Sequence, residues 1–368
     1  MSTNVQRIVH LVTTFNCGGL EQVIVNLIKH TPADLGVEHV VISLMDEIDM
    51  AKQLPEDTLY ISLHKQPGND PKIHLKLFQL LKLLKPTAFH TYNFGTIEYH
   101  PIAKLAGVKV NVHADHGLGG DHPEGKSFFH NKIRKLASFF INEYIVVSDD
   151  LKNWVINTVG VNAKKVDFVF NGVEVQEYAP NQRENFTKEA PFKLLNVGRA
   201  AGVKNQASLI RAFSLAKIKD PEMNIHLTIV GDGPEFNNLL SLRDELGLSE
   251  SIALPGLQFD INDRMAQCDG FVLSSKYEAM PMTVLEAMSN TRPVICPMVG
   301  GVCDFISNDD AMLIKGNCDE SLADAIVNLY HMPARERESM ASRGYQSVFN
   351  VYSVKNMVSK YMKKYRIY

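Results

Sequence analysis

Short apolar runs alternate with amphipathic segments along the whole chain. The runs have the length of buried strands, and the segments between them repeat apolar residues at helical spacing. This alternation predicts an α/β fold, in which parallel sheets are covered by helices. The first series of expected strands lies at 7–12, 37–44, 58–61, 88–92, 109–113, 144–147 and 165–170. The second series lies at 192–197, 225–230, 251–254, 270–273, 293–295 and 311–314.

The helical segments and one polar stretch divide the chain into two domains. A core-facing helix is indicated by Leu20, Val23, Ile24, Leu27 and Ile28, which follow the i, i+3, i+4, i+7 and i+8 spacing. Two further helices are expected at 334–349 and 354–365. Residues 176–191 are polar, carry a proline near each end and show no periodicity, so we interpret them as a linker. We therefore expect domains at 1–175 and 192–350.

Composition excludes several classes of protein. The 368 residues suffice for two domains, and a 45% hydrophobic content is ordinary for a globular chain. The formal net charge of −3 argues against nucleic acid as a partner. The five cysteines include no Cys-x-x-Cys pair, which suggests reduced thiols in the cytoplasm. The N-terminus lacks the apolar core of a signal peptide, and no apolar run is long enough to cross a bilayer, whereas attachment to its surface remains open.

Two carboxylates follow the expected strand at 270–273. Glu278 lies in a turn, and Glu286 lies on the helix that comes next. Open α/β sheets bind ligands at the carboxyl ends of their strands, and carboxylates there can accept hydrogen bonds from sugar or ribose hydroxyls. The alternative is a pair of helix-surface acids. Pro281 restricts the turn and Glu286 falls in an apolar stretch, so a ligand is favoured.

Two cations follow the expected strand at 192–197. Arg199 and Lys204 stand beside Gly198 and Gly202. The planar fork of an arginine and the compact charge of a lysine suit a diphosphate. The alternative is a solvated charge pair.

The first expected strand leads into Gly18 and Gly19, which open a helix. Glycines there let backbone amides approach a ligand, and a helix N-terminus favours anions. The alternative is a tight turn without a ligand.

The sequence Asp115-His116-Gly117 follows the strand at 109–113. His116 could donate to a sugar hydroxyl or to a phosphate. His113 and His116 could instead ligate a metal with Asp121 and His122, but a zinc site needs three or four ligands at fixed geometry, so we expect no metal. A structural histidine at a strand end is the third possibility.

Residues Gly120–Ser127 match the phosphate-loop pattern Gly-x4-Gly-Lys-Ser and would make the protein a phosphotransferase that uses Lys126. The context disfavours this alternative. Such a loop leaves its strand directly, whereas His113–Gly119 intervenes here, and Asp121 and Glu124 would repel phosphates.

Residues Lys126–Phe140 form a basic, aromatic helical pattern. Its charged face holds Phe128, Lys132, Lys135 and Phe139, and an adjacent core stripe is expected at Phe129, Ile133, Leu136 and Phe140. Phenylalanine beside lysine on an exposed face suits a membrane surface of anionic lipids. The alternative is an amphipathic helix with a wide core face.

Several motifs occur in a characteristic order: Gly18-Gly19-Leu20-Glu21, Asp115-His116-Gly117, Val147-Ser148, Asn171-Gly172-Val173, Gly198-Arg199 with Lys204, Val230-Gly231-Asp232-Gly233-Pro234, and Glu278 with Glu286. Through them the chain resembles, over nearly its whole length, the GT-B retaining glycosyltransferases of family 4, above all members that build bacterial exopolysaccharides and surface glycans. The resemblance implies two Rossmann-like, doubly wound domains facing a central cleft, with residues 351–368 crossing back to the first. At Gly300–Asp304 the chain departs from a Pro-Glu pair common in the family.

The resemblance also implies roles for particular residues. The candidates for catalysis are His116, Arg199, Lys204 and Glu278. Arg199 and Lys204 would hold the donor diphosphate, Glu278 the donor sugar, Glu286 the ribose, and His116 would lie near the transferred sugar. The remaining donor-binding candidates are Gly18, Gly19, Gly231, Met280, Pro281 and Met282.

The expected activity is transfer of a sugar from a nucleotide sugar, with a UDP-sugar favoured, to a glycan or a polyprenyl-diphosphate-linked acceptor. Two cations can stabilise the leaving diphosphate, so neither a metal nor another cofactor is expected. The expected location is the cytoplasm, with peripheral attachment to the plasma membrane. A non-catalytic partner protein of the same fold is the remaining alternative, although the four catalytic candidates are all present.

Overall fold

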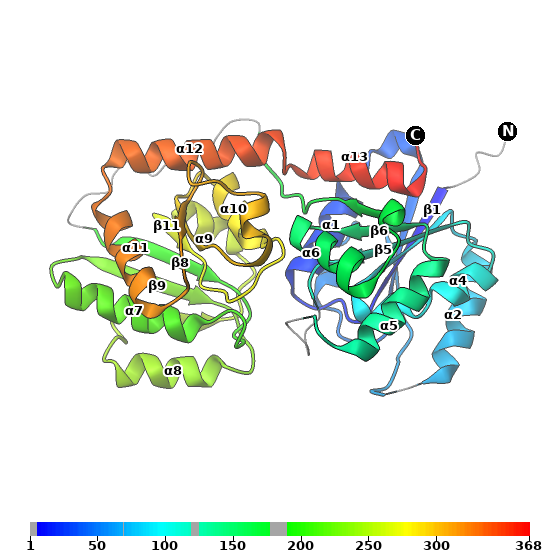
Figure 1. The fold of residues 1–368 in the computed structure, drawn as a ribbon, viewed down its shortest axis with the longest axis horizontal. Coiled ribbons are helices and arrows are strands. Elements are labelled where there is room, and N and C mark those ends of the chain that lie inside the picture. The colour runs from blue at the N-terminus through cyan, green and yellow to red at the C-terminus, as the bar shows by residue number, and fades with distance from the viewer. Residues whose placement is uncertain (1–5, 69, 119–124, 177–189) are drawn as a thin grey trace. The chain divides into compact units, whose positions relative to one another are not determined.

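The structure is a computed structural model that describes residues 6–68, 70–118, 125–176 and 190–368. It divides into two compact units, which are described here one at a time (Figure 1). Unit 1 takes in Met1–Gly172 together with Val354–Tyr368, and unit 2 takes in Val173–Ser353.

Unit 1 is built on a seven-stranded parallel sheet with the strand order β3-β2-β1-β4-β5-β6-β7. The order reverses between β1 and β4, which is where doubly wound sheets open a crevice at their carboxyl ends. The elements are β1 (Gln6–Val12), α1 (Gly19–Lys29), β2 (Val37–Ser43), β3 (Leu59–Ser62), α2 (Pro71–Leu84), β4 (Ala88–Tyr92), α3 (Phe94–Ile97), α4 (His100–Leu105), β5 (Val110–Asp115), α5 (Phe128–Ala137), β6 (Glu143–Val146), α6 (Asp149–Trp154), β7 (Val166–Phe168) and α13 (Val354–Tyr365).

Unit 2 is built on a six-stranded sheet with the order β10-β9-β8-β11-β12-β13, and its order reverses between β8 and β11. Its strands also pair in parallel. The elements are β8 (Phe192–Val197), α7 (Gln206–Lys219), β9 (Ile225–Val230), α8 (Phe236–Glu245), β10 (Ile252–Gly256), α9 (Ile261–Gln267), β11 (Gly270–Val272), α10 (Met282–Ser289), β12 (Val294–Pro297), β13 (Met312–Ile314), α11 (Asp319–His331) and α12 (Ala334–Asn350).

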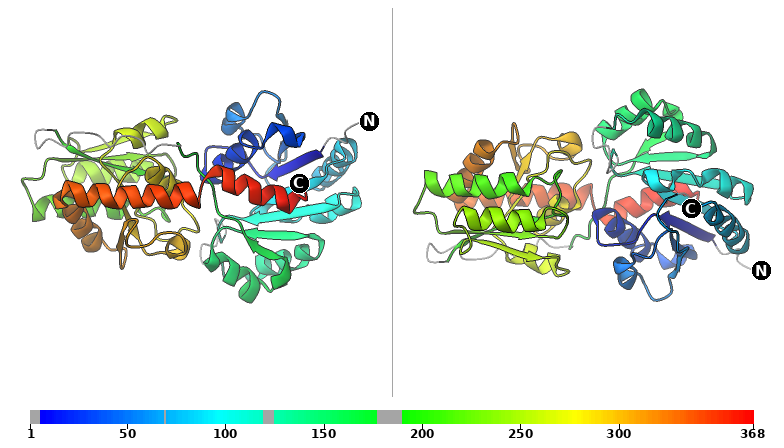
Figure 2. Two further views of the ribbon diagram at one scale, coloured as in Figure 1. Left: turned by 90° about the horizontal axis from the view of Figure 1, so that it is seen from above. Right: turned by 90° about the horizontal axis from the view of Figure 1, so that it is seen from below.

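The α/β prediction is confirmed. Each expected strand has a counterpart whose ends differ by two residues at most. Helices cover the sheets, and α13, drawn in red in Figure 2, lies beside the strands of unit 1, where it packs against α1 and β5. The chain thus returns to unit 1 for its last helix. Most of the expected linker, 177–189, lies outside the described residues.

Each unit has its own apolar core. In unit 1 the strand residues Leu11 and Phe89 share a buried cluster with Leu77 and Leu81 of α2. In unit 2 Leu194 of β8 shares a buried cluster with residues of α7 and α11. Full burial of one such side chain contributes roughly 1.5–3 kcal/mol, so each unit holds its sheet edges rigidly in place for the loops that follow.

Local signals in the sequence set the ends of α2. The Asp70 side chain accepts a hydrogen bond of 3.1 Å from the Lys72 amide, and Pro71 follows it at the first helical position. A capping carboxylate and a proline at the first position both favour a helix start. The helix ends at Lys85, whose φ of 47° places it in the left-handed region.

Candidate active site

The carboxyl ends of β8 and β11 bring Lys204 and Glu278 together in unit 2. These strands are neighbours in the sheet, although the two residues are 74 positions apart in the chain. The Lys204 Nζ donates to Glu278 Oε1 at 2.6 Å, and the Ser275 hydroxyl donates to the same oxygen at 2.6 Å. Glu278 is buried, whereas the Lys204 side chain is 30% exposed. The ammonium can therefore reach a ligand in solvent while it holds the carboxylate.

Arg199 lies on the same loop with its side chain exposed. Its guanidinium makes no ion pair with any residue that the structure describes. The backbone around it is fixed, because the Gly198 amide donates to the Val230 carbonyl and the Ala200 amide donates to the Asp232 carbonyl, each at 3.0 Å. A rigid loop that presents an unpaired guanidinium is suited to bind an anion.

Gly231 supports this loop. Its φ is +137°, and a Cβ added there would lie 2.0 Å from the Gly198 carbonyl oxygen. No other residue type fits such a contact, so the glycine lets the turn after β9 pack on the loop that carries Arg199. A direct contact between Gly231 and the donor stays a prediction.

Glu286 lies on α10 in a desolvated setting. Burial raises the pKa of its carboxyl from 4.5 to about 7. Among the described residues, no donor forms a hydrogen bond to this carboxyl. A carboxyl that lacks donors in the protein can accept them from a ligand hydroxyl.

Met280 and Pro281 lie in the turn between Glu278 and α10, Met282 begins the helix, and all three are buried. Pro281 caps the helix and has no amide hydrogen, so it cannot donate a backbone hydrogen bond to a nucleotide sugar. The sequence analysis missed the support given by the turn after β12, where the Gly301 amide donates to the Glu278 carbonyl at 2.9 Å. A Cβ at Gly300 would lie 2.2 Å from that carbonyl oxygen. The adjacent glycines Gly300 and Gly301 were the sequence signal that could have indicated this close approach.

In unit 1, α1 begins at Gly19 with Gly18 as its cap. A Cβ on Gly18 would lie 2.4 Å from the Oε2 atom of Glu21, so the glycine makes room for this carboxyl. Burial raises the pKa of Glu21 to about 7. Glu21 was part of a quoted motif but was not recognised as a perturbed acid, because its pKa depends on burial that sequence does not display.

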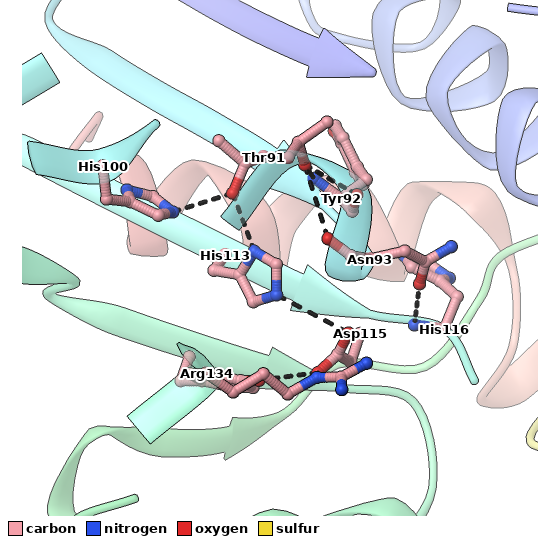
Figure 3. Close-up of polar contacts among 10 residues, drawn as sticks. Thr91, Tyr92, Asn93, His100, His113, Asp115, His116 and Arg134 are labelled. Atoms are coloured by element: carbon pink, nitrogen blue, oxygen red, sulfur yellow. Dashed lines mark hydrogen bonds and ion pairs between the residues drawn. The ribbon is translucent and has the colours of Figure 1, made fainter. Parts of the chain in front are cut away.

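His116 directly follows β5. Its backbone amide donates to Asn93 Oδ1 at 2.8 Å, and Figure 3 shows the Asn93 side chain pointing toward it. Burial lowers the pKa of His116 to about 4, so the imidazole is neutral at physiological pH. A neutral imidazole can donate one hydrogen bond to a sugar hydroxyl without carrying charge.

Asp115, the residue before His116, is fully buried. The Tyr144 hydroxyl donates to its Oδ2 at 2.6 Å, and Arg134 Nε lies 3.4 Å from the same atom. Burial alone would raise the pKa of this carboxyl, but the Arg134 guanidinium, His113 and Tyr144 outweigh it and hold the pKa below its usual range. Figure 3 shows the chain of contacts that runs from Arg134 through Asp115 and His113 to Thr91.

The histidine pair considered as metal ligands does not point to one site. The His113 Nδ1 atom lies 2.7 Å from the Thr91 hydroxyl, inside the contact chain of Figure 3. Asp121 and His122 lie outside the described residues. Within the described part of the chain, no three His, Cys, Asp or Glu side chains come together as a metal site.

Comparison with known proteins identifies the family. The family described as "Glycosyltransferase Family 4" matches residues 17–177, and the family described as "Glycosyl transferases group 1" matches residues 179–347. The chain belongs to the family 4 GT-B glycosyltransferases. The resemblance in the sequence is thereby confirmed, and both halves of this glycosyltransferase lie within the matched ranges.

The names of two relatives of this glycosyltransferase state an activity. It is 28% identical over 272 residues to an Escherichia coli UDP-Gal:alpha-D-GlcNAc-diphosphoundecaprenol alpha-1,3-galactosyltransferase, an alignment that covers 71% of this chain and 70% of that protein. It is also 28% identical to a Bacillus anthracis N-acetyl-alpha-D-glucosaminyl L-malate synthase, with coverage of 62% and 61%. The chain thus spans less than two thirds of the second relative.

Solved structures agree on the fold. Anabaena Alr3699/HepE, in complex with UDP and glucose, superposes with a TM-score of 0.83 at 18% identity, covering 97% of this chain and 98% of that one. A glycosyltransferase from Rickettsia africae gives a TM-score of 0.79 at 20% identity, with coverage of 99% and 98%. At these identities the likeness shows the GT-B fold alone.

The phosphate-loop alternative receives no support from the described part of the segment. Gly120–Glu124 lie outside the described residues. The Ser127 hydroxyl caps α5 by accepting a hydrogen bond of 3.4 Å from the His130 amide. Lys126 is exposed.

The expected core stripe on the helix after this segment was wrong. Phe129, Leu136 and Phe140 are exposed, and the buried positions of the helix are Arg134 and Ala137. The Arg134 guanidinium lies 4.8 Å from the Phe94 ring centroid and contacts the Trp154 ring as well. The helical periodicity of the apolar residues is present, but the side chain that points into the interior is Arg134, which is held by Asp115 and by the rings of Phe94 and Trp154. No described helix is both long and apolar enough to cross a membrane.

A pocket of about 360 Å³ lies at the carboxyl edge of the unit 1 sheet. Thr13 follows β1, Lys65 follows β3, and Glu98 and Tyr99 follow α3. It therefore occupies the crevice beside the point where the strand order reverses. Sequence analysis did not find it, because residues from distant strands form its wall.

Proposed function

We propose that the protein transfers a sugar from a nucleotide sugar, with UDP as the favoured nucleotide, to a hydroxyl of a glycan or of a polyprenyl-diphosphate-linked acceptor. The proposal includes retention of the anomeric configuration and no requirement for a metal ion. The observation that carries it is the contact between Lys204 and Glu278 at the carboxyl edge of unit 2.

The charges of this edge fit the chemistry. Cleavage of the bond between sugar and diphosphate leaves negative charge on the diphosphate. Arg199 and Lys204 provide two cations on one fixed loop, and preorganised charges stabilise a transition state at little reorganisation cost. Glu278 would accept hydrogen bonds from the donor sugar, and Glu286 would accept them from the ribose.

Unit 1 contributes two further proposed contacts. The amide of Gly19, at the start of α1, would face the phosphates. The neutral imidazole of His116 would donate to a hydroxyl of the transferred sugar. The E. coli relative, whose name gives a UDP-sugar donor and a lipid-linked acceptor, and the UDP complex of HepE support the choice of donor.

The unit 1 pocket is the proposed binding place of the acceptor. Thr13, Asp70, Glu98 and Tyr99 offer hydroxyl and carboxylate groups, which suit the hydroxyls of a sugar. The two carboxylates, Asp70 and Glu98, outnumber the single lysine of the wall, Lys65, so the wall disfavours a diphosphate. The glycan part of the acceptor, rather than its phosphate, is therefore the proposed occupant.

An anionic bilayer surface is the proposed partner of α5. Phe128 is 82% exposed and Phe139 is 72% exposed, and Lys132 and Lys135 are exposed on the same helix. Aromatic rings at a membrane interface combine with lysines that contribute about 1 kcal/mol each near an anionic surface. A lipid-linked acceptor would be available at that surface.

Co-sedimentation with vesicles that contain phosphatidylglycerol tests the membrane contact. Lys132→Glu with Lys135→Glu should reduce binding severalfold, whereas Lys315→Glu with Lys355→Glu, at exposed positions elsewhere, should not. Equal binding by both double variants would reject the surface.

The activity itself is tested by a thermal-shift screen against UDP, GDP, ADP and their sugars, with and without Mg²⁺, followed by turnover assays with those that bind. We expect a shift without metal for one nucleotide class, and loss of turnover in Lys204→Ala. Folded protein that binds and turns over no nucleotide sugar would refute the proposal. A shift with Mg-ATP alone would favour the phosphotransferase.

A further inference from the structure

Asn93 has a backbone conformation that asparagine rarely adopts. It follows β4 directly, and its φ of 55° and ψ of 179° fall in a region that is populated almost only by glycine. Such strain persists only where the surroundings determine it, and it is found preferentially at functional sites. Nothing in the sequence pattern singled this residue out.

Two hydrogen bonds hold Asn93 against the end of β5. Its backbone amide donates to the Ala114 carbonyl at 2.8 Å and extends the pairing of β4 with β5 by one step. Its side-chain Oδ1 then accepts from the His116 amide at 2.8 Å. The strained backbone therefore places an amide oxygen where the chain leaves the sheet, as Figure 3 shows.

The residue before His116 is fixed from the other side. Asp115 is bound by the Tyr144 hydroxyl and lies against Arg134, so its side chain is held in the interior. His116 is thus held by its own amide on one side and through Asp115 on the other. The backbone that carries the imidazole is therefore fixed on both sides.

We propose that Asn93 is a positioning residue that fixes the backbone of His116 and, through it, the imidazole that meets the transferred sugar. This inference rests on the role of His116 in the proposed function. Glycine would adopt the same backbone without strain, and what asparagine adds is the oxygen that accepts from His116. If this hydrogen bond served stability alone, its loss would lower the Tm, whereas loss of a bond that positions His116 would lower kcat.

The decisive variant is Asn93→Gly, which removes both the strain and the acceptor. We expect its Tm to stay the same or rise by roughly 2–4 °C. We expect kcat to fall by about tenfold to a hundredfold with a smaller change in the donor KM, because a misplaced catalytic group costs rate more than binding. The His116 amide should also exchange its hydrogen faster in this variant.

Two companion variants separate positioning from stability. Asn93→Asp keeps an acceptor oxygen, so it should retain most of kcat at pH 8, but its new charge should move the acid limb of the pH profile to higher pH. Lys85→Gly is the matched control, since Lys85 also has a positive φ of 47° and caps α2 at its far end. It should be as stable as the wild type or more so, with unchanged kcat.

The outcomes are distinct. Wild-type kcat in Asn93→Gly would overturn the inference, and so would a loss of kcat that is matched by a fall in Tm. If His116→Ala keeps full activity while Lys204→Ala abolishes it, the role of Asn93 fails and the proposed function stands. If the wild type turns over no nucleotide sugar, both fail.

Discussion

Glu286 allows a test that joins stability to ligand binding. Its pKa is about 7 in the folded protein, against 4.5 for an ordinary glutamate, and burial is the cause. The folded state therefore holds this proton more tightly than the unfolded state does. The resulting stability is fully present below pH 4.5 and is lost as the pH rises to about 7.

The size of the effect follows from the shift. Each pKa unit corresponds to about 1.4 kcal/mol, so the free energy of unfolding should fall by about 3 kcal/mol between these limits. Some contact of the carboxyl with solvent lowers this figure toward about 2 kcal/mol. In a unit of this size, 2–3 kcal/mol corresponds to a Tm change of roughly 5–10 °C. Glu286→Gln should remove this dependence and should be the more stable protein at pH 8.

Ligand binding should offset the cost of ionising the buried Glu286 carboxyl. Ribose hydroxyls that donate to the ionised carboxyl favour its charged form. The affinity for a nucleotide sugar should therefore increase by up to about tenfold per pH unit below pH 7 and level off above it. A UDP-sugar is the appropriate ligand, because the terminal phosphate of free UDP itself titrates near pH 6.

Calorimetric titration and thermal unfolding from pH 5 to 8 measure both effects. Glu21 has a raised pKa of its own, so the wild type and Glu286→Gln are best compared in a Glu21→Gln background. A Tm difference between them that stays constant with pH would show that Glu286 does not titrate in this range. A pH slope of affinity that persists in Glu286→Gln would refute the ribose contact.

Three further outcomes are expected. Arg199→Ala and Lys204→Ala should each lower kcat by roughly 10²-fold in steady-state assays, the cost of one charge-stabilising donor, and a loss below threefold in both would reject the diphosphate role. Gly231→Ala should destabilise unit 2 by at least about 2 kcal/mol in thermal unfolding, because its Cβ would meet the Gly198 carbonyl, and an unchanged Tm would contradict this. Arg134→Met should cost about 3–5 kcal/mol in urea unfolding, since Asp115 would stay buried without its cation, and a cost below 1 kcal/mol would contradict that pairing.

The strands could be predicted because the chemistry of a parallel sheet is visible in sequence. Such strands are buried on both faces and read as continuous apolar runs, as at Gly270–Val272 and Val294–Pro297. Helix α5 shows the limit of the method. Its periodicity marks an apolar stripe but does not say what covers that stripe, and Phe129 and Leu136 are exposed.

The candidate residues could be named one by one from the sequence, but the contacts between them could not. Lys204 and Glu278 were each recognisable as charged groups after a strand, and neighbouring strands bring them together. Asn93 and Glu21 were missed for a different reason. The value of each depends on a backbone angle or on burial, which arise only once the chain has folded.

Two kinds of polar residue in this protein should respond to mutation with opposite changes in stability. Asp115 and Arg134 compensate each other inside unit 1, so loss of either partner leaves a buried charge and should lower stability and activity together. Glu286 and Asn93 instead hold an unfavourable state, one through desolvation and one through backbone strain. The desolvation of Glu286 and the strain at Asn93 are already present in the folded protein. A ligand can therefore bind to these residues without reorganising them. Relief of either cost should therefore make the protein more stable and less active, which is the signature that separates a functional group from a structural one.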